Sequence, residues 1–301
     1  MWQPLLEQLK MGDIKALART LSFVENEQKG YQELLQSLTF SKAAKIIGIT
    51  GPPGAGKSTL TDGLIKELID GGKKVAVLCV DPSSPFNLGA VLGDRIRMSN
   101  WYTHPNVFIR SLATRGSMGG LHPKIIELSD ILKAAGFDYI IVETVGVGQS
   151  EIEIAGLSDT TVVVLVPEGG DEIQTMKAGL MEIADIFVVN KADRPDAAAF
   201  MKNLRQMLAP AFSHHQIEVP ILATSAHEHK GTAELLQAIL HHQSLETNNG
   251  RKSWLLTEKA FQLIQQERMK DIDKGELKRR IDKEAGEKNF NLYKIVGDYV
   301  S

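Results

Sequence analysis

The chain has 301 residues, of which 43% are hydrophobic and 24% charged, with a formal net charge of −3 at pH 7. This composition is typical of a globular protein and lacks the basic excess of a nucleic-acid-binding domain. No apolar run is long enough to cross a bilayer and the first residues do not form a signal peptide, so we expect no membrane partner. The one cysteine, Cys79, cannot form an intrachain disulfide, and a cytoplasmic location is expected.

Three zones follow one another along the chain. Apolar residues at helical spacing predict an N-terminal helical extension over residues 1–42. Residues 43–245 alternate between short apolar runs and helical patterns, which predicts an α/β domain with a mostly parallel sheet flanked by helices. After a polar break, residues 246–301 are highly charged and helical in pattern, which predicts a C-terminal helical segment. Its last helix is a candidate dimerisation face, although packing on the α/β domain of its own chain would give the same pattern.

The expected strands are short runs rich in β-branched residues. Because ligands of parallel sheets bind at the carboxyl ends of the strands, residues that follow these runs are the first candidates for a site. The runs are Ile46–Thr50, Val75–Val80, Val107–Arg110, Tyr139–Glu143, Thr161–Val166, Ile186–Asn190 and Ile221–Ala223.

A phosphate-binding loop follows the first expected strand. Gly51–Ser58 fits G-x-x-x-x-G-K-[ST], and a helical pattern comes directly after it. In this motif backbone N–H groups and the helix dipole face the phosphates, the lysine neutralises the β and γ oxygens, and the serine hydroxyl ligates Mg²⁺. The alternative is a plain Gly/Pro turn. The expected nucleotide contacts here are Gly51, Gly54, Ala55, Gly56, Lys57, Ser58 and Thr59.

Guanine recognition is indicated by the N-K-x-D pattern Asn190–Asp193 at the end of another expected strand. Guanine presents donors at N1 and N2 that one carboxylate, Asp193, can accept, whereas adenine has no such pair. Asn190 would bridge the phosphate loop to the base, and the stem of Lys191 would cover the ring. We expect Ser225 and Ala226, after the last strand, to approach the base, with a backbone N–H near guanine O6.

Acidic residues stand where a phosphate-bound metal is expected. Asp81 and Glu143 each end an apolar strand, and Asp94 is a third candidate in a later loop. Together with Ser58 they are the expected Mg²⁺ ligands, because carboxylates at strand ends hold this ion in phosphate sites. Helix caps or turn residues are the alternative for Asp81 and Asp94.

The glycine-rich stretch after Glu143 is typical of a γ-phosphate sensor. Gly146 would place its N–H near the terminal phosphate, and Gln149 would orient the attacking water. Lys57, Glu143 and Gln149 are therefore the expected catalytic residues. A glycine-rich strand-to-helix turn without such a role is the alternative.

The chain resembles the MeaB/ArgK family of P-loop GTPases, on Val80–Pro85, Gly93–Met98, Arg115–Leu121 and Glu143–Glu151. The resemblance implies a GTP- and Mg²⁺-dependent chaperone that gates adenosylcobalamin delivery to methylmalonyl-CoA mutase, or a related acyl-CoA mutase, and protects or reactivates it. It also implies a homodimer joined by C-terminal helices and a third switch loop over Gly169–Lys177. Which mutase is the partner, and the identity of any arginine finger, stay open.

Rival functions remain at this point. The pairs His214–His215, His227/His229 and His241–His242 suggest a nickel or cobalt metallochaperone GTPase, although no C-x-x-C accompanies them. An ATP-dependent small-molecule kinase and a regulatory binder with negligible hydrolysis also fit the motifs. Arg110 and Arg115 are expected to contact either the terminal phosphate, a partner or surface acids.

Overall fold

The structure is a computed structural model that describes residues 2–40, 44–81, 98–114, 121–144, 150–168, 183–212, 219–245, 250–286 and 290–300. The chain divides into two compact units, Met1–Lys252 and Ser253–Ser301. Within the described residues, none of the helices combines enough length with enough apolar character to cross a membrane.

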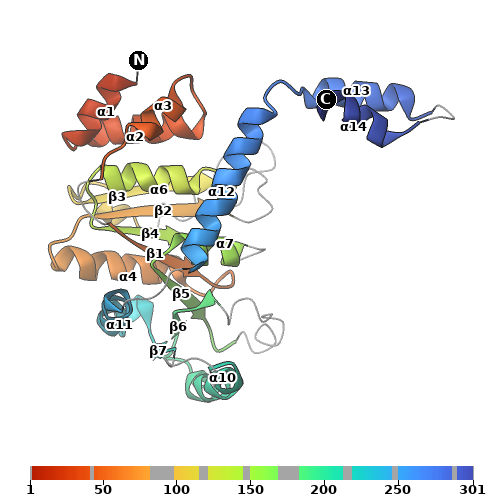
Figure 1. Cartoon of the computed structure of the whole chain (residues 1–301). Helices are drawn as coiled ribbons and strands as arrows, with labels where there is room; N and C mark the ends of the chain where they lie inside the picture. Colours follow the sequence, from red (N-terminus) through yellow and green to blue (C-terminus); the bar gives the residue numbers. More distant parts are fainter. Residues whose placement is uncertain are drawn as a thin grey trace. The chain divides into compact units, whose positions relative to one another are not determined.

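The first unit is built around a parallel sheet (Figure 1). In the described residues seven strands pair in the order β3-β2-β4-β1-β5-β6-β7, and all their pairings are parallel. β1 therefore lies at the centre, between β4 and β5. The strands are β1 (Lys45–Thr50), β2 (Val75–Asp81), β3 (Val107–Ala113), β4 (Tyr139–Glu143), β5 (Thr160–Leu165), β6 (Ile186–Val189) and β7 (Ile221–Ala223).

All the strands expected from the sequence are present, and the predicted fold class is confirmed. The largest difference is at β3, which runs three residues beyond the predicted Arg110. The polar Ser111 interrupts the apolar run there, but the strand continues because its backbone pairs with β2 as far as Ala113 opposite Asp81. Ladder hydrogen bonds rather than side-chain polarity thus set the end of this strand.

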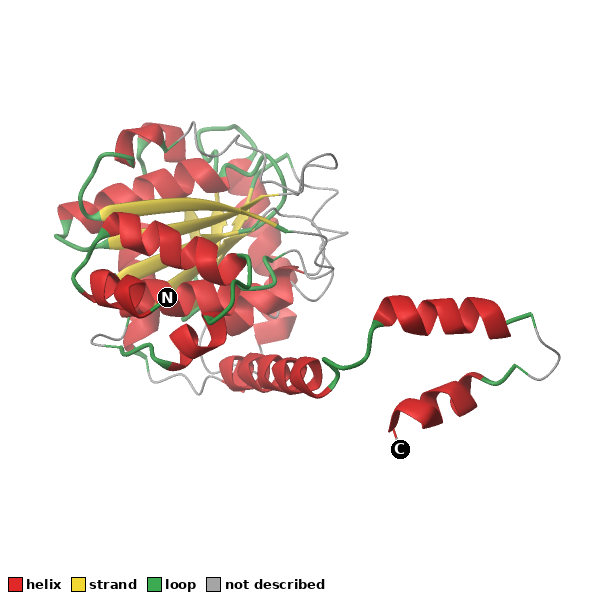
Figure 2. Cartoon of the chain, turned by 90° about the horizontal axis from the view of Figure 1, so that it is seen from above, coloured by secondary structure: helices red, strands yellow, loops and turns green. Residues whose placement is uncertain are grey.

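Helices cover both faces of the sheet (Figure 2). On one face, α4 and α11 bury residues such as Leu64 and Ile239 against Ile47 of β1. On the other, α10 packs Leu204 against Phe187 of β6. In the described residues, the helices of this unit after the first strand are α4 (Lys57–Asp70), α6 (Ile125–Ala134), α7 (Ser150–Leu157), α10 (Ala197–Phe212) and α11 (Thr232–Ser244), with short 3₁₀ turns η1 (Ser99–Trp101) and η2 (Ala226–Glu228).

Among the residues described before the sheet, three helices are present: α1 (Gln3–Lys10), α2 (Ile14–Glu25) and α3 (Tyr31–Gln36). Asp13 caps α2 by accepting hydrogen bonds from the backbone N–H groups of Lys15 and Ala16. At its other end, Glu25 forms an ion pair with Arg110 of β3 at 2.5 Å. This pair fixes the N-terminal helices against the β3 edge, which gives Arg110 a structural partner.

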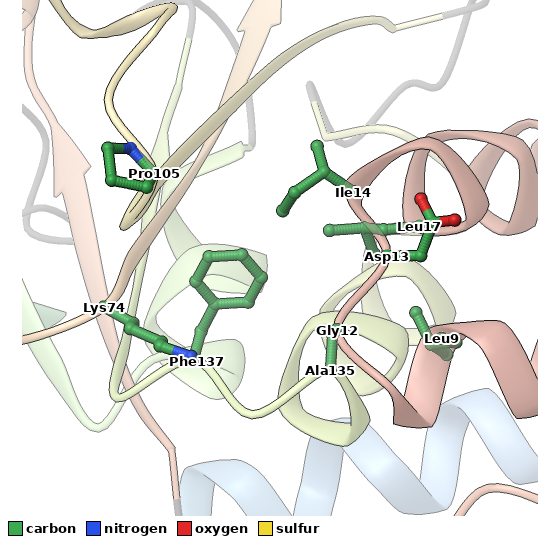
Figure 3. Close-up of a pocket in the computed structure, with 9 residues that line it drawn as sticks. All are labelled: Leu9, Gly12, Asp13, Ile14, Leu17, Lys74, Pro105, Ala135 and Phe137. Atoms are coloured by element: carbon green, nitrogen blue, oxygen red, sulfur yellow. The ribbon is translucent and has the colours of Figure 1, made fainter.

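A small cavity of about 80 Å³ lies where the α1–α2 turn meets the loops that enter β2, β3 and β4 (Figure 3). Lys74, Pro105 and Phe137 line it from these loops, and Asp13 and Ile14 line it from the turn. The cavity is therefore at the amino ends of the strands, opposite the edge at which ligands of parallel sheets bind.

The second unit contains most of α12 (Gly250–Arg268), with α13 (Lys274–Glu284) and α14 (Leu292–Val300). Arg280 of α13 pairs with Asp298 of α14 at 2.5 Å, and this hydrogen bond, followed by that of Glu284, raises the pKa of the guanidinium. Among the described residues of this unit, Ile295 is the only buried one. The unit thus has very little apolar core of its own.

Candidate functional site

The phosphate loop joins β1 to α4 at the carboxyl edge of the sheet. Gly51 has φ 137°, and a Cβ there would lie 2.1 Å from the carbonyl oxygen of Val164 on β5. Gly56 has φ 85°, and a Cβ there would lie 2.3 Å from Nδ2 of Asn190. Glycine is required at both positions by conformation and by space. Between them, Gly54 is exposed and Ala55 is fully buried.

Lys57 is the first residue of α4 and turns back over the loop. Lys57 is 7% exposed, and its Nζ donates hydrogen bonds to the carbonyl oxygens of Gly51 at 2.8 Å and Pro52 at 3.0 Å. A cation is thereby held inside a loop at a helix N-terminus, and this arrangement favours an anion such as phosphate. Thr59, one of the expected contacts, lies half-buried in the same first turn.

A buried carboxylate stands beside this loop at the end of β4. Glu143 is 3% exposed and accepts hydrogen bonds from Ser58 Oγ at 2.7 Å and Thr61 Oγ1 at 3.0 Å. Thr61 was not expected from the sequence. Its position one turn after Ser58 on α4 is the signal that places both hydroxyls on one face of the helix.

Asp81 ends β2, the strand that pairs with β4. The residue is 6% exposed, and its strand neighbour Cys79 is the register partner of Glu143. Side chains two residues apart on a strand share a face of the sheet, so Asp81 lies on the same face as Cys79 and its partner Glu143. Both carboxylates also belong to the last residues of adjacent strands, at the carboxyl edge of the sheet. Carboxylate and hydroxyl oxygens are the donors that Mg²⁺ prefers, so Ser58, Asp81 and Glu143 fit this ion. In the described residues, no group of three or more His, Cys, Asp and Glu side chains is arranged to hold a metal.

Asn190 connects the phosphate loop to the part of the site that is expected to bind the base, which contains Asp193 and the loop after β7. The residue is 3% exposed, and Nδ2 donates to the carbonyl oxygen of Ala55 at 2.9 Å. Oδ1 accepts from Thr224 Oγ1 at 3.1 Å and from the backbone N–H of Ala226 at 3.2 Å. One amide therefore holds the phosphate loop and the loop after β7 together. The bridge from the phosphate loop to the base that the sequence suggested stays a prediction.

The other end of the site is more open. The Asp193 side chain is 37% exposed, and Oδ1 accepts a hydrogen bond from Ser225 Oγ at 3.1 Å. Lys191 has the left-handed φ of 56°, and the next residue, Ala192, donates its N–H to the carbonyl oxygen of Thr224 at 2.9 Å. This turn places the Asp193 carboxylate at the partly exposed rim of the site, where its two oxygens can accept two parallel hydrogen-bond donors.

Several expected residues lie outside the described residues, namely Asp94, Gly146, Gln149, Arg115, His214, His215 and the segment 169–177. Of the remaining histidines, His242 forms a hydrogen bond between Nδ1 and Thr160 Oγ1 at 2.9 Å. Its Nε2 is 3.6 Å from Asp185, so this ring has partners in the protein. The roles of the site residues in catalysis and binding stay predictions.

Comparisons with known proteins agree with this geometry. The family described as methylmalonyl Co-A mutase-associated GTPase MeaB matches residues 17–280. The GTPase ArgK of Escherichia coli is 34% identical over 277 residues, which cover 89% of this chain and 83% of that protein. The fused isobutyryl-CoA mutase of Geobacillus kaustophilus is 36% identical over 251 residues, which cover 78% of this chain and 23% of that protein.

Among solved structures, the crystal structure of a LAO/AO transport system kinase matches with a TM-score of 0.66 and 29% identity. The match covers 89% of this chain and 83% of that one. Together with the family match, these similarities confirm the resemblance that the sequence motifs carried and the GTPase activity expected from it.

Proposed function

The chain belongs to the MeaB family of methylmalonyl-CoA mutase-associated GTPases, and we propose that it serves as a chaperone of an adenosylcobalamin-dependent acyl-CoA mutase. The observation that carries this proposal is the relative named a fused isobutyryl-CoA mutase, in which a region similar to this chain forms part of a longer protein. The presence of both regions in one polypeptide supports a close association of this kind of GTPase with a mutase. In this proposal, GTP binding and hydrolysis gate cobalamin delivery and protect or reactivate the mutase, with methylmalonyl-CoA mutase as the first candidate.

The nucleotide lies, in this proposal, across the carboxyl edge of the sheet. Lys57 and the loop N–H groups bind the β and γ phosphates, and Asp193 binds the guanine edge. Ser58, Asp81 and Glu143 hold Mg²⁺, which would offset phosphate charge, and Asp94 completes the set expected from sequence. The buried bonds of Glu143 to Ser58 and Thr61 support this, because they already orient the carboxylate.

Hydrolysis then depends on positioning and charge. Lys57 stabilises the charge that develops on the transferred phosphoryl group, and Gln149 orients the attacking water. Gly146 contacts the γ phosphate and is released after hydrolysis, so the segment around it reports the nucleotide state. Turnover by the chain alone is slow in this proposal, and the mutase completes the site.

We assign the chain a three-part organisation of residues 1–42, 43–245 and 246–301, with the last part forming a homodimer contact. The second structural unit supports this assignment, since it exposes large apolar side chains with almost no core to hold them. Phe261→Glu in the full chain is expected to shift the light-scattering mass from dimer to monomer, and an unchanged dimer would contradict it. The exposed set is Trp254, Leu256, Phe261, Leu263, Ile264, Met269, Phe290, Leu292, Tyr293, Val296 and Tyr299.

Co-purification with candidate mutases tests the chaperone function. The full chain is mixed with methylmalonyl-CoA mutase or isobutyryl-CoA mutase in the presence of GDP or of a non-hydrolysable GTP analogue. We expect a stable complex with one mutase and a nucleotide-dependent change in cobalamin transfer to it. Lys57→Ala should remove the nucleotide dependence. Failure to bind any acyl-CoA mutase in either nucleotide state, with GTP hydrolysis intact, would reject the proposal.

A further inference from the structure

A histidine lies next to the carboxylate that we assign to base recognition. His227 belongs to η2, and its Nδ1 is 4.0 Å from Oδ1 of Asp193. The loop that carries it is closed by hydrogen bonds from Ser225 N to Lys230 O at 3.1 Å and from Glu228 N to Ser225 O at 2.8 Å. Because the turn is this short, its backbone keeps the His227 ring within reach of the Asp193 carboxylate.

The charged groups around this ring are few. Nε2 of His227 is 3.9 Å from Oε1 of Glu228, whose other oxygen accepts from Lys230 Nζ at 2.8 Å. That hydrogen bond, followed by the charge of Glu228, raises the pKa of the Lys230 ammonium. In the part of the chain that the structure describes, Asp193 and Glu228 are the carboxylates that pair with the His227 ring. The His227 side chain is 61% exposed, so protons reach it freely.

The hydrogen-bonding capacity of Asp193 Oδ1 is limited. A carboxylate oxygen offers two lone-pair directions, and Ser225 Oγ already occupies one of those on Oδ1 at 3.1 Å. Guanine requires the other, because its N1–H and N2–H groups are parallel donors that need both oxygens of one carboxylate. A protonated imidazole at Nδ1 is a second charged donor for the same position.

We propose that His227 tunes the affinity for guanine nucleotides, because its protonated imidazole competes with guanine for Oδ1 of Asp193. The proposal rests on the proposed function, since it takes Asp193 as the base-binding carboxylate. With a neutral ring, Asp193 is open to the base. With a protonated ring, the nucleotide must first displace an ion pair, so guanine nucleotides bind more weakly.

Calorimetric titration of GDP at about pH 8 and about pH 5.5, on either side of the range in which histidine usually titrates, tests this. Between these conditions the wild-type protein should lose about three- to fivefold more affinity than His227→Gln, the size of an exposed ion pair. The terminal phosphate of GDP also titrates near pH 6, but it does so in both proteins, so their difference is the measurement. His229→Asn is the matched control, because asparagine tolerates the left-handed φ of 55° at that position, and it should follow wild type.

A permanent cation gives the complementary test. His227→Lys should bind GDP weakly at both pH values and show a reduced pH response. Identical pH profiles for wild type and His227→Gln would overturn the proposal, as would wild-type affinity of His227→Lys at about pH 8.

A separate measurement tells this failure from failure of the base assignment. Asp193→Asn is titrated at about pH 8 with GDP and with xanthosine diphosphate. An unchanged preference for GDP would reject Asp193 as the base reader and the His227 proposal with it. A changed preference beside unaltered pH profiles would reject the role of His227 alone.

Discussion

The two ends of the site are built differently. At the phosphate end, Lys57 and Glu143 are 7% and 3% exposed and are bonded to neighbouring groups of the loop and of α4. At the base end, the side chains of Asp193 and His227 are 37% and 61% exposed. Folding of the core therefore preorganises the phosphate end, whereas the base end is a rim of loops. We expect changes at the first to cause large losses of affinity or stability, and changes at the second to alter selectivity or to change affinity only a few-fold.

Lys57→Ala should have the largest effect. The ammonium is the one charge inside the phosphate loop among the described residues, and charge-assisted contacts to phosphate are strong. GDP affinity should fall about 100-fold or more, measured by calorimetry. Lys66→Ala, in the same helix but exposed and paired with Asp70, should bind as wild type. A loss of less than about fivefold in Lys57→Ala would contradict the preorganised phosphate end.

Asn190→Ala tests the link between the two ends. It removes bonds to Ala55, Thr224 and Ala226 and leaves their buried groups without this partner. The free energy of unfolding in urea should fall by about 2–4 kcal/mol, since each buried polar group that loses its partner is costly. Asn26→Ala, an exposed position in the N-terminal region, should change it by less than about 0.5 kcal/mol. If Asn190→Ala and Asn26→Ala had equal free energies of unfolding, the bonds of Asn190 to the phosphate loop and to the loop after β7 would not contribute to stability.

Asp193→Asn should separate selectivity from stability. The amide offers a donor as well as an acceptor, so it fits xanthine, which has a carbonyl at C2 in place of the amine of guanine. The ratio of GDP to xanthosine diphosphate affinity should change by about 10- to 100-fold in competition titrations. The urea midpoint should stay close to that of wild type, because the side chain is partly exposed. A large loss of stability would place Asp193 with the structural residues of the phosphate end.

Local patterns predicted the site best where its chemistry is local. The phosphate loop, the strands around it and Asn190–Asp193 are each contiguous, and their expected elements are present. Thr61 was missed because its role depends on Glu143, which pairing of β1 with β4 brings next to α4. From the sequence, His227 was considered only as part of a possible metal-binding pair with His229. Its nearness to Asp193 was missed, because it follows from the pairing of β6 with β7. Long-range strand pairing, which no short pattern encodes, made these contacts.

Ser225→Ala should have the smallest effect and examines the rim most closely. Removing Ser225 Oγ takes one donor from Oδ1 of Asp193, so the carboxylate is less firmly held. GDP affinity at about pH 8 should fall only about two- to fivefold, the value of one ordinary hydrogen bond. Ser244→Ala, at the exposed end of α11, serves as the control and should bind as wild type.

The same variant also bears on the competition for Asp193. Without the serine hydroxyl, Oδ1 has room for both the imidazolium of His227 and a guanine N–H, so the two no longer exclude each other. The pH dependence of GDP binding in Ser225→Ala should therefore be weaker than in wild type, although its affinity at high pH is lower. A pH dependence that is as steep as in wild type would mean that crowding at Oδ1 is not what couples proton and base. In that case the His227 imidazolium would weaken GDP binding through its charge alone. The effects of His227→Lys and Ser225→Ala on the free energy of GDP binding would then be additive.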